Sequence, residues 1–375
     1  MLKVLLAGGG TAGHVNPALA IAEIIKEHYP DTDFMFVGTP DHIESSLVPK
    51  AGYKFTPMKI AGFQRQINFH NLVGNTKALC YLAASGARSK KILNDFKPDL
   101  VIGTGGYVSG PIVKKAAQMG IKTAIHEQNA YPGVTTRLLT KYVDRVMLTV
   151  EKAAEYFDKN VKYTVTGLPV RSAFKTMSKE KAREELGLDD KICILSTGGS
   201  LGAGAINSAV AELIEWYEKN GVEVNHIHSF GGMGKDTFLQ TLDKKGIDYK
   251  NNKRYILKQY IDNMPSCMAS ADLIISRCGA NALCEIECVG RASILVPSPI
   301  VAGNHQYHNG MVLQNANAAV CIEQKNFTPQ LLIEKVSEFI NNPHKLTELS
   351  QNAKSLYIPD TSDRVMAVLS ELINL

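Results

Sequence analysis

The feature that most constrains the fold is a pattern that occurs twice: an apolar strand, a glycine-rich turn and a helix. It stands first at residues 3–7 with the turn GGGTAGH, and again at residues 191–196 with the turn GGSLGAG. Further apolar strands alternate with helical segments after each occurrence, which is typical of parallel sheets covered by helices. The sequence therefore predicts an α/β protein with two Rossmann-like domains facing a cleft.

The length also favours two domains, because 375 residues exceed the usual size of a single core. We expect a first domain over residues 1–163 and a second over residues 164–360. The turn GLPVR at 167–171 is expected to link them. A last helix, at about 362–373 within the C-terminal segment 361–375, is expected to cross back to the first domain.

The individual elements follow from apolar runs and their punctuation by glycine and proline. Helices are expected to start at Pro17 and near Pro111, and to cover about 72–93, 281–289 and the segment up to Lys219. The loop after the strand at 292–296 is expected to carry Asn304, His305, Gln306 and Asn309. The remaining strands are expected at 33–37, 55–58, 99–102, 123–126, 145–149, 162–166, 223–229, 253–256, 273–276 and 319–322.

Composition excludes a membrane-spanning protein. Apolar residues make up 45% and charged residues 21%, as in ordinary soluble domains. No apolar run reaches the roughly 18–20 residues that span a bilayer. The start, MLKVLLAGGG, is broken by glycine and is expected to form a strand rather than a signal peptide. A cytoplasmic protein is predicted.

Charge is unevenly distributed. Residues 1–163 contain 20 lysines and arginines against 13 aspartates and glutamates, a net charge of +7, whereas residues 164–375 carry −2. A basic first half favours an acidic partner, whether nucleic acid, anionic lipid or a phosphorylated substrate. The expected helix at 72–93 ends with Arg88, Lys90 and Lys91 beside apolar residues. It is either an amphipathic helix packed on the sheet or a surface that touches anionic lipid.

The seven cysteines include no CxxC pair. Cys284 and Cys288 are spaced i, i+4 on an expected helix, which is a conceivable metal-ligand spacing. Their apolar neighbours favour buried free thiols in a reducing compartment instead. No metal site is predicted.

The stretch from Ser276 to Asn309 predicts a strand, a polar turn, a helix and another strand. Glu285 lies in the first turns of that helix among small and apolar residues. A carboxylate there can accept two hydrogen bonds from the vicinal diol of a ribose, or simply favour a helix N-terminal region. Gln306 and Asn309 offer amides that suit sugar hydroxyls.

The two glycine-rich turns suit phosphate groups. Gly8, Gly10 and Gly13 fit G-x-G-x-x-G, but the second strand ends in Val-Gly-Thr without the acidic residue that holds an adenosine ribose. A dinucleotide site is therefore disfavoured, although backbone N–H groups of such a turn can hold any phosphate. The second turn is the better candidate because Ser200 adds a hydroxyl. Arg171 either supplies charge to the same diphosphate or is an exposed cation in the linker.

His14 and Glu127 both follow strands of the first domain, so we expect them at the same edge of its sheet. A histidine there can act as a general base near neutral pH, or it can merely hold the loop. Glu127 is the rival base. The loop GTGGYVSG with Tyr107 is either a tight turn or a second anion-holding loop.

Together these residues resemble the bacterial MurG family, the N-acetylglucosaminyltransferases that convert lipid I to lipid II in peptidoglycan synthesis. The resemblance covers nearly the whole chain. It is carried, in the family's order, by GGGTAGHVNPALAIA, VGTPDHIESSLVP, GTGGYVSGPIV, HEQNAYPGVTTRLL, TGLPVR, TGGSLGAGAIN, SRCGANALCEI, VPSP and NHQYHN.

The resemblance implies a GT-B fold and inverting transfer of GlcNAc from UDP-GlcNAc to the 4-hydroxyl of MurNAc in lipid I. It implies no cofactor and no obligate metal. The implied partners are UDP-GlcNAc, lipid I, anionic lipids of the cytoplasmic leaflet, and cell-wall synthesis and division proteins, without nucleic acid. The implied location is peripheral, on the cytoplasmic face of the bacterial cell membrane.

Matching the family's motifs residue by residue assigns the site. His14, with Glu127 as its rival, is the expected catalytic base. Acceptor contacts are expected from Gly105, Tyr107 and His126. UDP-GlcNAc contacts are expected from Thr11, Ala12, Gly13, Asn129, Arg171, Ser200, Ile261, Ala280, Asn281, Ala282, Leu283, Cys284, Glu285 and Gln306.

The chain departs from the commoner family pattern at four positions. Ala12 replaces a frequent Gly, Thr136 an Asn and Cys278 a Ser, all mild changes. Leu168 replaces an Asn, which removes an amide from the linker.

Two other classes of protein stay open. A UDP-GlcNAc epimerase would use the same fold without a lipid acceptor, but the basic first domain disfavours it. A non-catalytic UDP-sugar-binding scaffold is disfavoured because it does not need His14, Glu127, Glu285 and Gln306 together.

Overall fold

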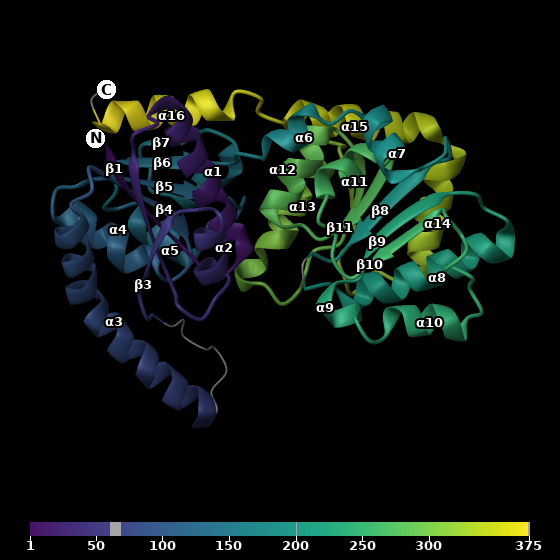
Figure 1. Ribbon diagram of the computed structural model, residues 1–375, viewed down its shortest axis with the longest axis horizontal. Helices are drawn as coiled ribbons and strands as arrows, with labels where there is room; N and C mark the ends of the chain where they lie inside the picture. The colour runs from purple at the N-terminus through teal and green to yellow at the C-terminus, as the bar shows by residue number, and fades with distance from the viewer. Residues whose placement is uncertain (61–68, 200, 374–375) are drawn as a thin grey trace. The chain divides into compact units, whose positions relative to one another are not determined.

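The computed structural model describes residues 1–60, 69–199 and 201–373, which form two compact units. The first unit contains Met1–Pro169 and Ile358–Leu375, and the second contains Val170–Tyr357. The chain thus changes unit within the GLPVR turn, and again just before the last helix. Each unit is built on one parallel sheet (Figure 1).

The first unit is a seven-stranded parallel sheet with strand order β3-β2-β1-β4-β5-β6-β7. Its strands are β1 (Lys3–Gly8), β2 (Asp33–Gly38), β3 (Lys54–Pro57), β4 (Leu100–Gly105), β5 (Lys122–Glu127), β6 (Arg145–Leu148) and β7 (Tyr163–Val165). Its helices are α1 (Ala12–His28), α2 (Glu44–Lys50), α3 (Phe69–Phe96), α4 (Ser109–Gln118), α5 (Val134–Leu139) and α16 (Thr361–Ile373), with a 3₁₀ turn at Glu151–Tyr156.

Successive side chains of β1 point to opposite faces of the sheet and so belong to two different cores of this unit. Val4 and Leu6 face a core shared with α1 and α16, whereas Leu5 and Ala7 face a core shared with α4 and the end of α3. All four side chains are fully buried. Both faces of the sheet are therefore covered, which explains why β1 is apolar from Val4 to Ala7.

Helix α16 belongs to the first unit although it follows the second unit in the chain (Figure 1). Its buried side chains Val365 and Leu369 join the core beside Val4 and Leu6. Arg145 also pairs with Glu371 at 3.0 Å.

The second unit is a six-stranded parallel sheet with strand order β10-β9-β8-β11-β12-β13. Its strands are β8 (Cys193–Thr197), β9 (Asn225–Ser229), β10 (Tyr255–Lys258), β11 (Leu273–Ser276), β12 (Ala292–Leu295) and β13 (Val320–Cys321). Its helices are α6 (Ser172–Thr176), α7 (Lys179–Leu186), α8 (Gly204–Asn220), α9 (Gly231–Gly234), α10 (Phe238–Lys244), α11 (Met264–Ser270), α12 (Ala280–Val289), α13 (His305–Asn315), α14 (Pro329–Asn341) and α15 (Pro343–Leu356), with a 3₁₀ turn at Ala302–Asn304.

The first helix begins earlier than the sequence predicts. Pro17 was expected at its start, but α1 begins at Ala12 and Pro17 lies inside it. The first turn closes before the proline, because Thr11 O accepts hydrogen bonds from His14 N and Val15 N. Pro17 then removes only one bond of the helical ladder.

The prediction of a loop at Asn304–Asn309 is also wrong, since α13 begins at His305. Its sequence, HQYHNGMVLQN, is polar on most sides and lacks the apolar repeat that marks a helix. Gly303 and Asn304 turn the chain sharply into it with φ of +63° and +51°. The helix then packs closely: a Cβ at Gly310 would lie 2.8 Å from the sulfur of Cys321.

The other expected strands overlap observed ones, and the long helix expected at 72–93 is α3. Six of the cysteines are described as free thiols, five of them buried, while the side chain of Cys80 lies outside the described part. Among the helices of the described ranges, none is both long and apolar enough to cross a membrane.

Candidate active site

In each unit the predicted site residues follow the carboxyl ends of neighbouring strands. The strand order reverses between β1 and β4 in the first sheet and between β8 and β11 in the second. Ligands of open parallel sheets bind at such switch points. The first glycine turn follows β1 and Tyr107 follows β4, while the second glycine turn follows β8 and Glu285 lies in the helix after β11.

A buried carboxylate, Glu44, holds the first glycine turn. Its oxygens accept hydrogen bonds from Gly10 N at 3.1 Å and from Thr39 N at 2.9 Å. Burial acts to raise the pKa of Glu44, but hydrogen bonds from Thr39 and Gly10 outweigh it and hold the pKa below its usual value. A Cβ at Gly9 would lie 2.3 Å from Glu44 Oε1, so a side chain there would push the carboxylate out of its present position.

His14 is the third residue of α1 and turns back onto this loop. Its Nδ1 lies 3.0 Å from Gly9 O, which can only accept, so Nδ1 carries the proton and Nε2 is the basic nitrogen. The ring lies against Gly105, where a Cβ would approach Nε2 to 2.9 Å. Gly105 has φ of +111°, which also favours glycine. The loop after β4 thus leaves room for the imidazole.

A pocket of about 590 Å³ opens beside His14. The first glycine turn lines it through Gly10 and Thr11, and the loop after β4 lines it through Tyr107, which is 59% exposed. The structure therefore brings together Thr11, His14 and Tyr107 from the predicted site. Asp41, His42 and Lys59 also line this pocket.

Glu127, the rival base, is buried and fully engaged. One carboxylate oxygen accepts from the backbone N–H and the side-chain amide of Asn129, both at 3.0 Å. The other oxygen accepts from Gly133 N at 3.1 Å. Glu127 thus fixes the loop that carries Asn129, and this geometry favours His14 over Glu127 as a base.

His126 lies beneath the same edge and is 1% exposed. Its Nε2 is 2.9 Å from Gly167 O, and Gln128 Nε2 is 3.1 Å from its Nδ1. Burial lowers the pKa of His126, so the ring is neutral at pH 7. Because the ring is buried, an acceptor would contact the loop above it rather than the ring itself. The predicted contact between His126 and the acceptor stays a prediction.

The second glycine turn is held by close backbone contacts. Gly199 and Gly202 both have φ of +82°, and a Cβ at Gly202 would lie 2.3 Å from Phe230 O. Helix α8 begins directly after this turn; none of the described side chains caps it, and its first turn has no acidic residue. Its N-terminal N–H groups are suited to an anion. Ser200, the predicted phosphate contact, lies outside the described residues.

Glu285 lies in the second turn of α12, and burial raises the pKa of its carboxyl to about 7. Arg171 acts in the opposite direction and favours the carboxylate. Among the described residues no hydrogen bond to this carboxylate is found. Leu283 and Cys284 are buried, so any contact that they make with a ligand would come from the backbone.

Two further predicted residues follow β10 and β12. Ile261 is buried with its side chain in the core, and it leaves only its backbone for a ligand. Gln306 Oε1 accepts a hydrogen bond from Ser298 N at 2.8 Å, which places the amide beside the turn after β12. Asn309 is buried and its amide donates to Cys278 O at 3.2 Å.

Comparison with known proteins decides the family. Residues 4–148 match the glycosyltransferase family 28 N-terminal domain, and residues 193–365 match its C-terminal domain. Relatives from Acetivibrio thermocellus and Bacillus cytotoxicus are 41% and 38% identical over 373 residues, 99% of this chain and 98% and 100% of theirs. Both are named UDP-N-acetylglucosamine–N-acetylmuramyl-(pentapeptide) pyrophosphoryl-undecaprenol N-acetylglucosamine transferase. The chain belongs to the MurG family.

Solved structures agree with this assignment. The crystal structure of Acinetobacter baumannii MurG is similar with a TM-score of 0.76 and 26% identity, over 99% of this chain and 100% of that one. A UDP-GlcNAc 2-epimerase from Neisseria meningitidis has a TM-score of 0.65 at 14% identity, over 99% and 100%. The second likeness shows the fold alone. The predicted GT-B fold is confirmed.

In this MurG-family chain Glu44, Asp41, His42 and Lys59 were not predicted as site residues. A signal for three of them was present, since PDHIE directly follows β2, which lies beside β1 in the sheet. The carboxyl-end rule applies to that strand as well. Lys59 follows β3 at the same edge.

Proposed function

We propose that this protein transfers N-acetylglucosamine from UDP-GlcNAc to the 4-hydroxyl of MurNAc in lipid I, with inversion at the anomeric carbon, to give lipid II. The observation that carries the proposal is the match along 99% of the chain to relatives named for this transfer. The geometry at the carboxyl edges of both sheets supports it.

The first unit is proposed to bind the acceptor. Its pocket of about 590 Å³ is of the size of small-molecule sites and lies between two glycine turns. His14 Nε2, held as the basic nitrogen by the Gly9 contact, takes the proton of the attacking hydroxyl. Gly105 and Tyr107 contact the acceptor, and Glu127 and Asn129 fix the neighbouring loop.

The second unit is proposed to bind UDP-GlcNAc. Charge that develops on the leaving UDP is stabilised by the uncapped start of α8, by Ser200 and by Arg171. Glu285, as a carboxylate, accepts hydrogen bonds from the ribose hydroxyls. The backbone at Ile261 and over 280–284 meets the nucleotide, and the amide of Gln306 meets the sugar.

The protein is proposed to bind the cytoplasmic membrane surface peripherally through the first unit, because the acceptor carries a polyprenyl chain. Val134, Leu138 and Tyr142 in and after α5 are 57%, 62% and 44% exposed. Lys114 of α4 lies over the Tyr142 ring at 4.7 Å, which places a cation at this apolar surface. Apolar side chains beside cations suit an anionic lipid surface. Division proteins are proposed as further partners.

Leu138→Glu should abolish sedimentation with phosphatidylglycerol vesicles, and unchanged sedimentation would contradict the proposed membrane contact.

His14→Ala tests the catalytic assignment. Loss of a general base is expected to lower kcat about 10²–10⁴-fold while UDP-GlcNAc still binds. His28→Ala is the matched control at the other end of α1, where Nδ1 contacts only Ile24 O at 2.9 Å among the described atoms. A His14→Ala enzyme with unchanged kcat would remove His14 from the mechanism.

A further inference from the structure

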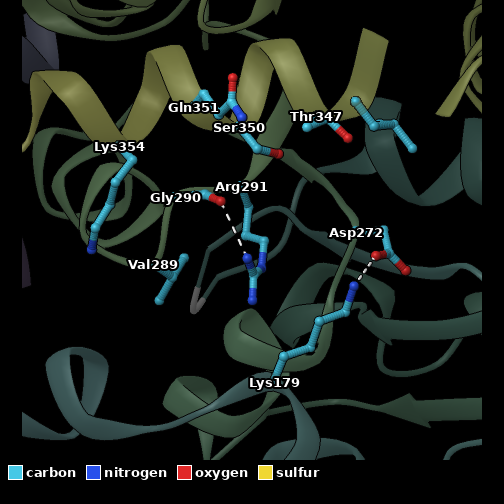
Figure 2. Close-up of a pocket in the computed structure, with 10 residues that line it drawn as sticks. Lys179, Asp272, Val289, Gly290, Arg291, Thr347, Ser350, Gln351 and Lys354 are labelled. Atoms are coloured by element: carbon cyan, nitrogen blue, oxygen red, sulfur yellow. Dashed lines mark hydrogen bonds and ion pairs between the residues drawn. The ribbon is translucent and has the colours of Figure 1, made fainter. Parts of the chain in front are cut away.

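The second unit carries a second pocket, remote from the carboxyl edge of its sheet. It holds about 420 Å³ and is lined by the residues that precede β11 and β12, by the end of α12 and by α15 (Figure 2). Asp272 and Arg291 stand directly before β11 and β12, at the amino ends of these parallel strands. The pocket is therefore at the opposite edge of the sheet from Glu285 and the second glycine turn.

Cations dominate this pocket. Lys179, Arg291 and Lys354 line it. Asp272 is the one acidic residue among the described residues of its lining, and it already pairs with Lys179 and with Arg183 at 2.7 Å. The exposed Glu180 also acts on Arg291. The end of α12 adds about half a negative charge. Four cations against two carboxylates and this helix end leave a net charge of about +1.5.

Arg291 is the least satisfied of these cations. Among the described residues, its guanidinium donates only to carbonyl oxygens, to Gly290 O at 3.3 Å and Ala269 O at 2.7 Å. The buried Nε has no hydrogen-bond partner in this part of the chain. Burial lowers the pKa of Arg291, the expected effect of desolvating a cation. Each terminal nitrogen of this half-buried guanidinium keeps a second N–H that no described residue accepts, and such N–H groups suit an oxyanion.

Hydroxyl and amide groups from α15 complete the pocket. Figure 2 shows Thr347, Ser350 and Gln351 on the helix above Arg291, with Lys354 beside them. Ser350 Oγ accepts from Ala292 N at 2.9 Å, so its own O–H can donate to a ligand. These groups suit the hydroxyls of a small molecule larger than a bare phosphate, and 420 Å³ lies within the usual ~300–1,000 Å³ of such sites.

We propose that this pocket binds a small phosphorylated molecule, a phosphomonoester whose oxyanion contacts Arg291, Lys179 and Lys354 and whose hydroxyls contact α15. The competing explanation is purely structural: Arg291 and Lys354 donate to Gly290 O and Cys288 O and thereby only cap α12. Those contacts leave a second N–H on each terminal nitrogen of Arg291 without an acceptor among the described residues.

The test is titration of the full-length protein with glycerol 3-phosphate, followed calorimetrically in saturating UDP so that the donor site is filled. We expect saturable binding of one equivalent. Lys354→Gln and Lys179→Gln should each weaken it about tenfold, as expected for losing one charge-assisted contact. Lys345→Gln is the matched control, because Lys345 is on α15 but pairs with Glu338 outside the pocket.

Arg291→Gln gives the sharpest result if it folds, and the two lysine variants keep the proposal testable if it does not. Phosphatidic acid vesicles distinguish a lipid headgroup from a soluble ligand. Binding to these vesicles alone, lost in Lys354→Gln, supports the site with lipid as the source. Absence of binding or equal binding by all variants would overturn the proposal. So would binding of polyglutamate, a polyanion without phosphate, in place of glycerol 3-phosphate.

Discussion

Glu285 and Glu287 lie two residues apart on α12, and burial raises the pKa of their carboxyls to about 7 and about 8. Their surroundings differ. Glu287 is 7% exposed, and a hydrogen bond with Cys284 lowers its pKa and partly offsets burial. The positive charge of Arg171 has the same effect on the pKa of Glu285. A carboxyl that titrates near pH 7 and must be ionised to accept ribose hydrogen bonds makes donor affinity depend on pH.

UDP affinity is therefore predicted to fall as pH falls. With a pKa of about 7 in the free protein, the carboxylate is mostly present at pH 8 and mostly protonated at pH 6. If only the carboxylate form binds, Kd rises about tenfold from pH 8 to pH 6. Calorimetric titration with UDP measures this. Glu285→Gln should flatten the profile, and Glu287→Gln should not; a wild-type profile parallel to that of Glu285→Gln would refute the assignment.

Residues such as Glu44 show the limit of prediction at this scale. The motifs identified His14, Arg171 and Glu285 because each stands beside a glycine turn or in an apolar helix. Glu44 stands beside no glycine turn in the sequence, and its one signal is its place shortly after β2; the fold brings its carboxylate to Gly10 and Thr39. Likewise Glu127 is a residue type that can act as a base, and only the three hydrogen bonds that it accepts show that it holds the loop.

At the scale of elements, strands were predicted well because parallel strands covered on both faces are continuously apolar. The start of α1 was misplaced because proline usually marks a first turn, whereas here the glycine turn itself starts the helix. Helix α13 was missed because its buried face consists of Asn309, Gly310 and Leu313 rather than an apolar stripe. Polar packing hides helical periodicity.

Strand β9 is the exception to apolar strands, since it buries two histidines. Ser196 Oγ of β8 lies 2.7 Å from His226 Nε2 and 2.7 Å from His228 Nδ1. Burial lowers the pKa of both rings to about 3, against about 6.5 in an unfolded chain. Between these values the unfolded state binds more protons, so stability is complete above pH 6.5 and is lost as pH falls toward 3.

The free energy of unfolding of the second unit is predicted to fall by about 2 kcal/mol per histidine between pH 7 and pH 5. Trp216, the only tryptophan, packs on this unit's core, so its fluorescence in urea titrations reports the unit's unfolding. His228→Asn should make the pH dependence shallower. The exposed His344→Asn is the control and should leave it unchanged. Equal slopes for His228→Asn and wild type would contradict the prediction.

At the scale of the molecule, two units with separate cores should respond separately to damage. Leu369 of α16 is fully buried in the first unit. Leu369→Ala is predicted to destabilise that unit by about 2–5 kcal/mol through a cavity. Glu371→Ala, which removes only the exposed pair with Arg145, should cost under about 1 kcal/mol.

Circular dichroism and Trp216 fluorescence separate the two responses, because Trp216 lies in the second unit. We expect Leu369→Ala to move the loss of helical signal to a lower urea concentration, whereas the midpoint of the fluorescence transition stays unchanged. A fluorescence transition that moved equally would show that the units unfold together.

The central claim is tested most directly by transfer of radiolabelled GlcNAc from UDP-GlcNAc to a lipid I analogue with a shortened prenyl chain, at neutral pH, with and without chelator. We predict label in the lipid-linked product, also in the presence of chelator, and a rate of transfer about 10²–10⁴-fold lower in His14→Ala. UDP-GlcNAc that bound without moving label to the analogue would contradict the proposed function. Release of the 2-epimer instead would favour an epimerase.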